Sequence, residues 1–395
     1  MKLHNNTIRG VHTALQAIFE EGQYADKVIE RTLKSNPKWG AKDRSFIAET
    51  TYEMVRWWRL IKHLSPSSNY WDLFGTYWIM QGHALPDWEE FERLHPEKIK
   101  GKYEAITDPG LLESIPEWLQ KLGSKELGEK WEPEIHALNE EAEVVLRVNT
   151  LKTTRERLKN RLADDGINTY IVKGYPDALI LEERQNVFRH PAFKEGLFEV
   201  QDASSQLVAA ALAVEPGMRV IDACAGAGGK SLHLAALMEN KGKVISMDVE
   251  EWKLQQAKLR ARRNGVSIFE PKVIEGTKTI KRLKESADRL LLDVPCSGLG
   301  VLRRNPDTKW KLSLESIEKV QQTQQEILQT YPSMLKKGGQ LVYATCSILP
   351  SENELQVKKF LESEAGKEFE LIEDKKVLAQ ESGFDGFYIA VLRKK

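Results

Sequence analysis

Three cysteines occur in the 395 residues of this chain, and each lies in a different glycine- or proline-marked motif of the second half. The motifs are Asp-Ala-Cys224-Ala-Gly-Ala-Gly-Gly-Lys-Ser, Asp-Val-Pro-Cys296-Ser-Gly and Ala-Thr-Cys346-Ser. Cys296 and Cys346 follow apolar runs at 289–293 and 340–345 that are typical of strands. Because ligands bind at the carboxyl ends of strands in an open α/β sheet, these two thiols predict a reaction that uses cysteine twice.

The chemistry that fits such a pair is methylation at C5 of a pyrimidine ring. That carbon is a poor nucleophile until a thiolate adds at C6 and makes the ring enamine-like, which splits one hard step into easier ones. The reaction also needs an acid near N3 and a second group for release of the product. Asp293 precedes the Pro-Cys296 pair and is a candidate for the first task. The residues alone leave open which cysteine attacks.

A glycine-rich turn earlier in the chain predicts a cofactor site. The apolar strand at 219–222 ends in an acid and is followed by three glycines between 226 and 229 and then by a helix. Such a turn lets a ligand approach the backbone and leaves helix N–H groups free. A second strand at 243–247 ends in Asp248, which is placed to bind ribose hydroxyls.

Two common nucleotide motifs do not fit this turn. Gly226-Ala-Gly-Gly-Lys-Ser lacks the third glycine of a dinucleotide-binding fold, and Cys224 stands where a P-loop needs glycine. S-adenosylmethionine remains, because it carries no phosphate. The turn need only pass close to its methionine portion while Asp248 takes the ribose.

The elements that would position these motifs change in kind along the chain. Residues 1 to about 65 show apolar positions at helical spacing, and prolines interrupt the pattern from there to 116. Three tryptophans in the interrupted stretch are assigned to the core rather than to base stacking: Trp71, Trp78 and Trp88. Between about 140 and 200 the patterns predict a small α+β module. From 216 onward strands and helices alternate, as in a doubly wound parallel sheet.

Composition narrows the class of protein. The formal net charge is zero, no run of 18 apolar residues occurs, and the three cysteines include no C-x-x-C pair and have no nearby histidine. These features disfavour a secreted or membrane-spanning protein, a disulfide framework and a zinc site. We therefore expect a cytoplasmic protein without a bound metal.

Two basic groups interrupt this neutral composition. The first lies on one predicted helix and is interpreted as a solvated face: Lys253, Lys258, Arg260, Arg262 and Arg263. The second follows the Cys296 motif and is a candidate for contact with phosphate: Arg303, Arg304, Lys309 and Lys311.

Five segments of the second half carry a family resemblance. They are Val200-Gln-Asp-Ala-Ser-Ser-Gln, residues 222–231, residues 293–310, Tyr343-Ala-Thr-Cys-Ser-Ile348 and Asp385-Gly-Phe-Tyr-Ile-Ala390. In order and spacing they resemble the RNA cytosine-5 methyltransferases of the RsmB/NSUN family. Arg147-Val-Asn149-Thr-Leu-Lys is similar to the family's upstream motif, and residues 1–65 resemble the NusB-like helical domain of the RsmB branch.

The resemblance implies a role for each matching residue. Cys346 would be the nucleophile, and Cys296 would assist release of the methylated product. Asp293 would contact the edge of the cytosine, and Lys230 would help to orient the base. The residues implied to line the S-adenosyl-L-methionine site are Cys224, Ala225, Gly226, Ala227, Gly228, Gly229, Lys230, Asp248, Thr277 and Asp293.

The sequence departs from the family pattern around the cofactor. Ala227 stands where the family usually has proline, and Ser231 where threonine is common; both leave a working turn. The third strand should end in an acid that reaches the adenine side. The segment here reads Val273-Ile-Glu-Gly-Thr277, so either Thr277 or a displaced Glu275 takes that role.

The resemblance also implies the fold and the domains. The fold would be α/β, with a Rossmann-like class I methyltransferase sheet at the C-terminus, preceded by a small α+β module and an all-helical NusB-like N-terminal domain. The implied domains are a helical RNA-binding domain at 1–135, an RRM-like α+β module at 136–200 and a cofactor-dependent methyltransferase domain at 201–395.

The implied function is methylation of C5 of a cytosine in small-subunit (16S) ribosomal RNA through a covalent adduct between cysteine and C6. We expect a monomer whose partner is RNA and which needs no membrane. Two alternatives stay open: a transfer-RNA methyltransferase of the same family, and a non-catalytic RNA-binding factor in ribosome assembly. Because the target base must leave its stack, a loop or partly unfolded RNA is the expected substrate.

Overall fold

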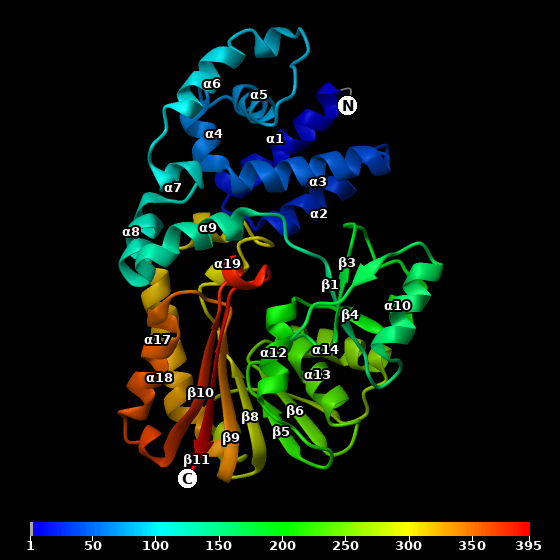
Figure 1. The fold of residues 1–395 in the computed structure, drawn as a ribbon, viewed down its shortest axis with the longest axis vertical. Helices are drawn as coiled ribbons and strands as arrows, with labels where there is room; N and C mark the ends of the chain where they lie inside the picture. The colour runs from blue at the N-terminus through cyan, green and yellow to red at the C-terminus, as the bar shows by residue number, and fades with distance from the viewer. Residues whose placement is uncertain (1–2) are drawn as a thin grey trace. The chain divides into compact units, whose positions relative to one another are not determined.

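The computed structural model describes residues 3–395, which form two compact units. The first unit comprises the chain up to Glu140 together with Leu302–Leu312, and the second comprises Glu141–Val301 and Ser313–Lys395. Figure 1 traces the helices of the first unit and the two sheets of the second. No helix within residues 3–395 is both long and apolar enough to span a membrane.

The first unit is built of helices whose apolar faces meet in one core. In α1 the positions Ile8, Val11, Leu15 and Ile18 are buried, as their helical spacing predicts. Its helices and 3₁₀ turns are α1 (Asn5–Phe19), α2 (Ala25–Ser35), α3 (Ala41–Arg56), α4 (Trp58–Leu64), α5 (Tyr70–Met80), η1 (Glu89–Phe91), α6 (Pro96–Glu104), α7 (Pro109–Leu112), α8 (Glu117–Leu127), η2 (Gly128–Lys130), α9 (Trp131–Asn139) and α16 (Thr308–Lys311).

The tryptophans of the proline-interrupted stretch belong to this core, as predicted. Trp78 is buried, and Trp71 and Trp88 are partly buried against the same cluster. The ring of Trp78 stacks on Phe74 with centroids 5.7 Å apart. Rings that pack in this way contribute apolar contact to the fold rather than a platform for bases.

Residues Leu302–Leu312, which follow the Cys296 motif in sequence, complete the helical unit. Nη2 of Arg56 donates a hydrogen bond to the carbonyl of Arg303 at 2.9 Å. Nε1 of Trp310 donates to the carbonyl of Val55 at 2.7 Å. The chain thus leaves the second unit after the Cys296 motif and returns to it eleven residues later, which a division into consecutive domains does not anticipate.

This packing corrects the interpretation of the basic group that follows the Cys296 motif. Lys309 is 1% exposed, and burial, followed by repulsion from Arg56, lowers its pKa well below the ordinary value. Arg303 is also buried and forms an ion pair with Glu140 at 3.4 Å. Side chains enclosed in this way are out of reach of an RNA backbone, so the prediction of phosphate contact is wrong for Arg303 and Lys309.

The second unit begins with the small α+β module that the sequence predicts, and its sheet is antiparallel. Its strand order is β2-β3-β1-β4, and its core includes Leu146, Leu158, Leu179 and Phe198. The elements of this module are β1 (Val145–Val148), α10 (Arg155–Asp164), β2 (Thr169–Tyr170), β3 (Ala178–Leu181), α11 (Pro191–Lys194) and β4 (Phe198–Val200).

A seven-stranded sheet forms the rest of the second unit, with strand order β10-β11-β9-β8-β5-β6-β7. The strands from β9 to β7 are parallel, and β11 is antiparallel to both of its neighbours. The strands are β5 (Arg219–Asp222), β6 (Lys243–Asp248), β7 (Phe269–Val273), β8 (Ala287–Asp293), β9 (Leu335–Thr345), β10 (Phe369–Val377) and β11 (Phe387–Lys394). This confirms the predicted α/β fold class.

Alternate residues of these strands are buried against opposite helix layers. Ile221 and Ile245 pack with α15, α17 and α18, whereas Val220 and Val244 pack with α12 and α13. Helices therefore cover both faces of the sheet. The loops at the carboxyl ends of its strands remain accessible for ligand binding. The helices and 3₁₀ turns are α12 (Ala203–Ala211), α13 (Gly229–Leu237), α14 (Glu251–Asn264), α15 (Thr277–Lys281), η3 (Leu299–Val301), α17 (Leu314–Thr330), η4 (Tyr331–Met334), η5 (Pro350–Glu352), α18 (Glu354–Leu361), η6 (Gly366–Glu368) and α19 (Ala379–Ser382).

Replacement of Trp310 tests whether Leu302–Leu312 supports the helical unit. Trp310→Ala removes the hydrogen bond to Val55 and the edge contact with Phe19, so the free energy of unfolding should fall by about 2 kcal/mol. Trp252→Ala is the matched control, because Trp252 is 62% exposed, and it should cost less than about 0.5 kcal/mol. Urea unfolding followed by circular dichroism measures both variants, and equal midpoints would contradict the assignment.

Candidate active site

The turn between β5 and α13 has the backbone that its glycines predict. Gly228, directly before the first residue of α13, has a φ of 82°. A Cβ at this position would lie 2.7 Å from the Cβ of Ala257 on α14, so the turn packs too closely for a larger residue. The N–H of Gly226 donates to Oδ2 of Asp248 at 2.8 Å. That bond joins the turn to the end of β6.

A cavity of about 630 Å³ lies beside the turn, at the carboxyl ends of β5, β6 and β8. Half of the predicted cofactor residues line it: Cys224, Gly226, Asp248, Thr277 and Asp293. The other half do not line it: Ala225, Ala227, Gly228, Gly229 and Lys230. Glu275 lines the cavity as Thr277 does, so the structure does not choose between the two candidates for the adenine side.

One wall of the cavity was not predicted from the sequence. It is formed by one face of α17 and the residue after it, with Thr323, Glu326, Ile327, Thr330 and Tyr331 in the lining. Their spacing of three and four residues shows that they share a helix face. That spacing does not indicate that this helix face contacts a ligand. The sequence therefore does not predict these lining residues.

The charges of the cavity suit a nucleoside without phosphate. Four carboxyl groups are in the lining, on Asp248, Glu275, Asp293 and Glu326, against the single ammonium group of Lys253. Such a site repels phosphate and stabilises a cationic sulfonium or amino group. Apolar surface for a base comes from Val249, Ile274, Ile280 and Ile327. These carboxyl groups and apolar surfaces fit S-adenosyl-L-methionine.

Cys296 and Cys346 lie side by side beyond the ends of β8 and β9. These strands pair in parallel with Asp293 opposite Ala344, and the two Sγ atoms are 3.2 Å apart. The contact with Cys346, together with burial, raises the pKa of the Cys296 thiol well above its ordinary value. The structure therefore brings together the two cysteines that the sequence paired, with Cys296 protonated at neutral pH.

The third cysteine has different surroundings. Burial, followed by the negative charge of Asp222, raises the pKa of Cys224 well above its ordinary value. A thiol that stays protonated is a poor nucleophile. Cys224 therefore fits a role in the wall of the cavity, where its side chain is found.

Lys230 and Asp293 form an ion pair next to the cysteine pair. Nζ of Lys230 lies 2.7 Å from Oδ2 of Asp293 and 5.4 Å from the ring centroid of Phe387. Burial acts to lower the pKa of Lys230, but the attraction of Asp293 and Cys346 outweighs it and raises that pKa. Lys230 is thus a fixed positive charge, and Asp293 reaches both that charge and the cofactor cavity.

A buried acid, Asp222, lies behind the turn. Its Oδ2 accepts from the hydroxyl of Ser231 at 2.6 Å, and the hydroxyl of Ser246 donates to Ser231 at 2.7 Å. Burial raises the pKa of Asp222 to about 7. The acid therefore carries only part of a charge near neutrality, and Ser231 serves as its partner although threonine is common there in the family.

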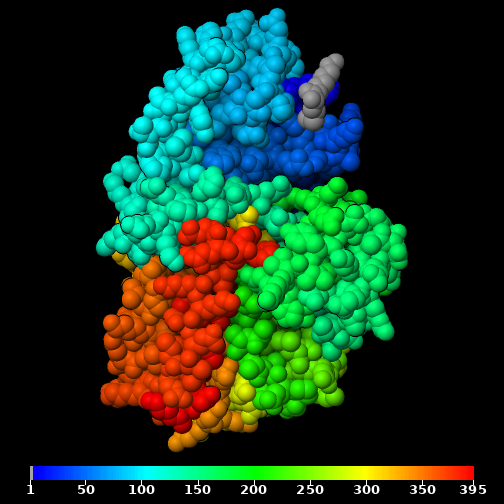
Figure 2. Space-filling view, viewed as in Figure 1, coloured from blue at the N-terminus to red at the C-terminus, as the bar shows by residue number. Residues whose placement is uncertain are grey.

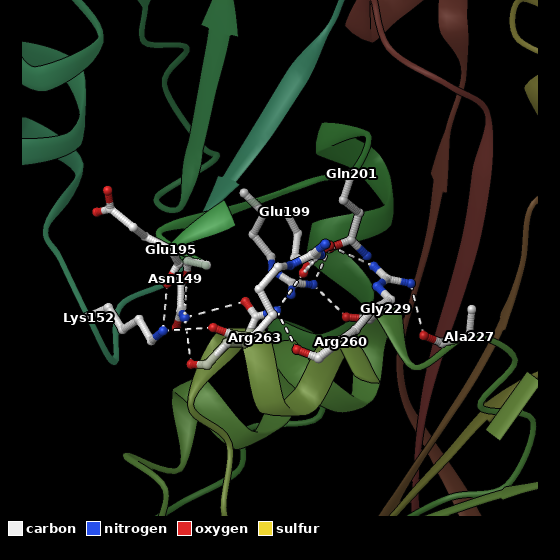
Figure 3. Close-up of polar contacts among 12 residues, drawn as sticks. Asn149, Lys152, Glu195, Glu199, Gln201, Ala227, Gly229, Arg260 and Arg263 are labelled. Carbon is white, nitrogen blue, oxygen red and sulfur yellow. Dashed lines mark hydrogen bonds and ion pairs between the residues drawn. The ribbon is translucent and has the colours of Figure 1, made fainter. Parts of the chain in front are cut away.

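Two arginines hold the carbonyls of the cofactor turn, and Figure 3 labels one of them, Arg260, together with its acceptor Ala227. Arg147 on β1 is 3% exposed and donates to the carbonyl of Gly229 at 2.5 Å. Arg260 on α14 donates to the carbonyl of Ala227 at 2.9 Å. The antiparallel module thus supports the turn through Arg147, in the motif that resembled the family upstream of the main sheet.

Glu199 on β4 is the centre of this network. It is 2% exposed, lies opposite Arg147 in the strand pairing, and accepts hydrogen bonds from Arg260, Arg263 and Asn264. The interpretation of the basic helix as a solvated face is therefore wrong for Arg260 and Arg263. It is correct for the exposed side chains of Lys258 and Arg262.

The strand order and the place of the cavity are those of a class I methyltransferase. A family model described as 16S rRNA methyltransferase RsmB/F matches residues 209–393. A second model, described as the ferredoxin-like domain of RsmF/B-like methyltransferases, matches residues 115–188. The chain belongs to the RsmB/F family of methyltransferases, which confirms the resemblance inferred from its motifs.

Curated relatives agree with this family. The chain is 38% identical over 254 residues to the probable ribosomal RNA small subunit methyltransferase B of Synechocystis sp., a match covering 63% of this chain and 56% of the relative. It is 38% identical over 287 residues to the ribosomal RNA small subunit methyltransferases B of Vibrio cholerae and Escherichia coli. Those matches cover 71% of this chain and 65% and 66% of the relatives, so the chain spans less than two thirds of their length.

Solved structures share the fold. The crystal structure of PH0851 matches all of this chain and all of its own, with a TM-score of 0.82 and 26% identity. A methyltransferase homologue from Pyrococcus horikoshii matches 73% of this chain and 98% of its own, with a TM-score of 0.64 and 28% identity. NSun6 from the same organism shares the fold over 72% of this chain and 99% of its own, with a TM-score of 0.65 and 23% identity.

Removal of the Glu199 carboxylate tests the network around the cofactor turn. Glu199→Ala leaves Arg260, Arg263 and Asn264 without their shared acceptor, so the free energy of unfolding should fall by about 3 kcal/mol. Glu195→Ala is the matched control, because the side chain of Glu195 is 48% exposed and its carboxylate pairs with the surface residue Arg161. It should cost less than about 1 kcal/mol. Denaturant titration compares the two, and equal losses would contradict the buried network.

The same carboxylate should make stability depend on pH. Burial acts to raise the pKa of Glu199, but the arginines and Asn264 outweigh it and hold that pKa below the ordinary value of 4.5. Its contribution is therefore complete above about pH 5 and is lost as the pH falls through the lower folded-state value. Between about pH 5 and 3 the stability of the wild type should fall more than that of Glu199→Gln. Parallel acid dependence in urea titrations would refute this.

Proposed function

We propose that this protein transfers the methyl group of S-adenosyl-L-methionine to C5 of a cytosine in small-subunit (16S) ribosomal RNA. The observation that carries the proposal is the pair of thiols, 3.2 Å apart, next to the ion pair of Lys230 and Asp293. A cavity with four carboxyl groups in its lining, which suits a nucleoside without phosphate, adjoins that ion pair through Asp293. A purely RNA-binding protein has no need of this combination.

The residues divide the work of a covalent mechanism. Cys346 adds as a thiolate to C6 of the cytosine, while Asp293 binds the base edge near N3 and Lys230 orients the ring. The addition at C6 makes C5 nucleophilic, and S-adenosyl-L-methionine, when bound, would be the source of the electrophilic methyl group. The C5 proton then leaves to a base, the bond between C6 and Sγ breaks, and Cys296 assists this release. The 3.2 Å separation lets both thiols reach one ring.

The cofactor assignment rests on the lining of the cavity. Asp248 would accept from the ribose hydroxyls, and Cys224 and Gly226 would border the methionine portion. Thr277 and Glu275 would serve the adenine side, with the apolar face of α17 opposite. The other predicted residues of the turn, which do not line the cavity, would contribute by setting the backbone conformation of the turn.

Ribosomal RNA is proposed as the substrate because the relatives named above are ribosomal RNA small subunit methyltransferases B. The reaction needs a cytosine turned out of its stack, so a loop or partly unfolded stretch of the RNA fits best. We further propose that the helical unit contributes RNA contacts and that the protein acts as a cytoplasmic monomer. Transfer RNA and a purely binding role in ribosome assembly are the outcomes that the experiment below separates.

Bisulfite sequencing of total RNA, from cells with and without this gene, tests reaction and substrate together. We expect one protected cytosine of small-subunit ribosomal RNA to become convertible when the gene is absent. A lost signal in transfer RNA would keep the chemistry and move the substrate. Unchanged protection in every RNA would overturn the proposed reaction and favour the assembly factor.

Replacement of the nucleophile should abolish turnover while RNA binding survives. Cys346→Ala removes the sulfur that bonds to C6, so methyl transfer should fall more than about 10³-fold. Transfer of radiolabelled methyl groups to 16S ribosomal RNA measures the loss, and filter binding measures RNA affinity. Turnover near the wild-type rate would show that Cys346 is not the nucleophile.

Replacement of the second thiol should instead trap the intermediate. Cys296→Ala leaves Cys346 able to add to C6 but removes the group that assists release, so a covalent protein–RNA adduct should accumulate. A denaturing gel detects it as a slowly migrating species. Cys224→Ala is the matched control, because its thiol lines the cofactor cavity, and it should give no such band. A clean lane for Cys296→Ala would contradict the release role.

A further inference from the structure

A buried carboxylate, that of Glu352, joins the loops that carry the two cysteines. Glu352 is fully buried, and each of its oxygens accepts a hydrogen bond from the residue that follows a cysteine. Oε2 accepts from the backbone N–H of Ser297 at 2.8 Å, and Oε1 accepts from the hydroxyl of Ser347 at 2.6 Å. The two serine hydroxyls lie 3.1 Å apart. One carboxylate therefore ties the loop after β8 to the loop after β9.

Glu352 is itself held in place by buried neighbours. Nε2 of Gln324, on α17, donates to Oε2 of Glu352 at 3.1 Å and to the carbonyl of Pro295 at 2.9 Å. The hydroxyl of Tyr343, on β9, donates to the backbone carbonyl of Glu352 at 2.7 Å. Gln324 and Tyr343 are fully buried. The position of the carboxylate is thus fixed from the sheet and from α17 before it reaches either loop.

The neighbouring Asn353 strengthens the same junction. Its Oδ1 accepts from the hydroxyl of Thr345 at 2.5 Å, and its Nδ2 donates to the carbonyl of Ser347 at 2.9 Å. Thr345 and Ser347 flank Cys346 on both sides. The residues before and after that cysteine are therefore bound to the short segment that also carries Glu352.

Stability alone does not explain a charge in this place. A fully buried carboxylate loses its hydration, and hydrogen bonds return at most a comparable amount, so an apolar residue of similar size would stabilise a core as well. What an apolar residue would not provide is directed bonds to two separate loops. The sulfurs themselves are not among the hydrogen-bond partners of Glu352, so its hydrogen bonds position them through the serines.

We propose that Glu352 is a positioning residue of the methyl-transfer reaction, which holds Ser297 and Ser347 so that Cys296 and Cys346 face the same base. The role of Glu352 in catalysis rests on the proposed function. Its role in positioning the two thiols does not. A misplacement of about 1 Å would separate the attacking thiol from the releasing thiol, and errors of that size cost enzymes about 10²-fold in rate.

The first test needs no substrate. Diamide oxidises two adjacent thiols to a disulfide, taking one hydrogen from each as the S–S bond forms and being reduced to the corresponding hydrazine. In the wild type we expect a disulfide between Cys296 and Cys346, with Cys224 left free, as mass spectrometry of peptides would detect. Glu352→Ala should slow this closure at least about tenfold, because the two loops lose their common anchor.

The second test is turnover with 16S ribosomal RNA. Glu352→Ala should lower kcat by about 10²-fold and leave KM for the RNA within about twofold, since a buried carboxylate cannot touch the RNA. Glu352→Gln should restore most of both activities. Its amide oxygen can accept from Ser297 while its amide nitrogen donates to Ser347, so the link between the loops is kept without the charge.

Glu354→Ala is the matched control. It removes the same type of side chain two residues further on, but that carboxylate pairs with Lys376 on β10 and should affect neither assay. If Glu352→Ala does not fold, Ser347→Ala decides, because it removes only one hydroxyl of the link. It should slow diamide closure about threefold or more.

The positioning role would be overturned if Glu352→Ala formed the disulfide and turned over at wild-type rates. It would also be overturned if Ser347→Ala formed the disulfide at the wild-type rate. A glutamine variant as poor as the alanine variant would also overturn it, because charge rather than the link would then matter. Slower closure in Glu352→Ala, with no methyl transfer by the wild type, would refute the proposed function and leave the positioning of the thiols intact.

Discussion

The parallel pairing of β8 with β5 and β9 is the constraint on which the site depends. In the ladder Asp222 lies opposite Leu291 and Asp293 opposite Ala344, so the three strands end at one edge of the sheet. Each cysteine motif begins where one of these strands stops. A slip of one residue would turn each side chain to the other face. Register therefore gathers three motifs that are far apart in the sequence.

Strand pairing ends at that edge, however, and the loops beyond it need other bonds. Backbone groups outside the ladder are oriented by side chains, and in this protein those side chains are buried and charged. Arg147 and Glu199 serve the cofactor turn, and Glu352 serves the cysteine loops. Such groups contribute little net stability but allow few alternative arrangements. Buried charged side chains thus orient both the cofactor turn and the cysteine loops at one edge of the sheet. We infer that these side chains are buried to fix the geometry of the loops rather than to stabilise the fold.

The sequence predicted what is encoded locally. The strand at 219–222, the glycine turn and the strand-end cysteines all have signals within ten residues, and the structure places them as expected. The partners that support them have no such signal. Glu199 and Arg260 are 61 residues apart and resemble ordinary surface charges. The prediction of a phosphate contact for Lys309 fails because nothing in a local pattern shows that a lysine will be buried.

The sequence predicts part of what distinguishes the two thiols. Motif and spacing left open which cysteine attacks, and only the family resemblance assigned Cys346. The geometry adds an independent argument. Two thiols in contact do not ionise together readily, because the charge of the first raises the pKa of the second. The raised pKa belongs to Cys296, where the contact with Cys346 and burial are the main causes.

The fixed cation of Lys230 instead interacts with Cys346, whose attraction contributes to the raised pKa of Lys230. Addition to C6 requires a thiolate, whereas the thiol beside it must keep its proton until the product leaves. The cation of Lys230 beside Cys346, and the contact and burial that act on Cys296, create that asymmetry between two otherwise identical groups. The electrostatics of the described residues thus support Cys346 as the proposed nucleophile on grounds that no motif contains.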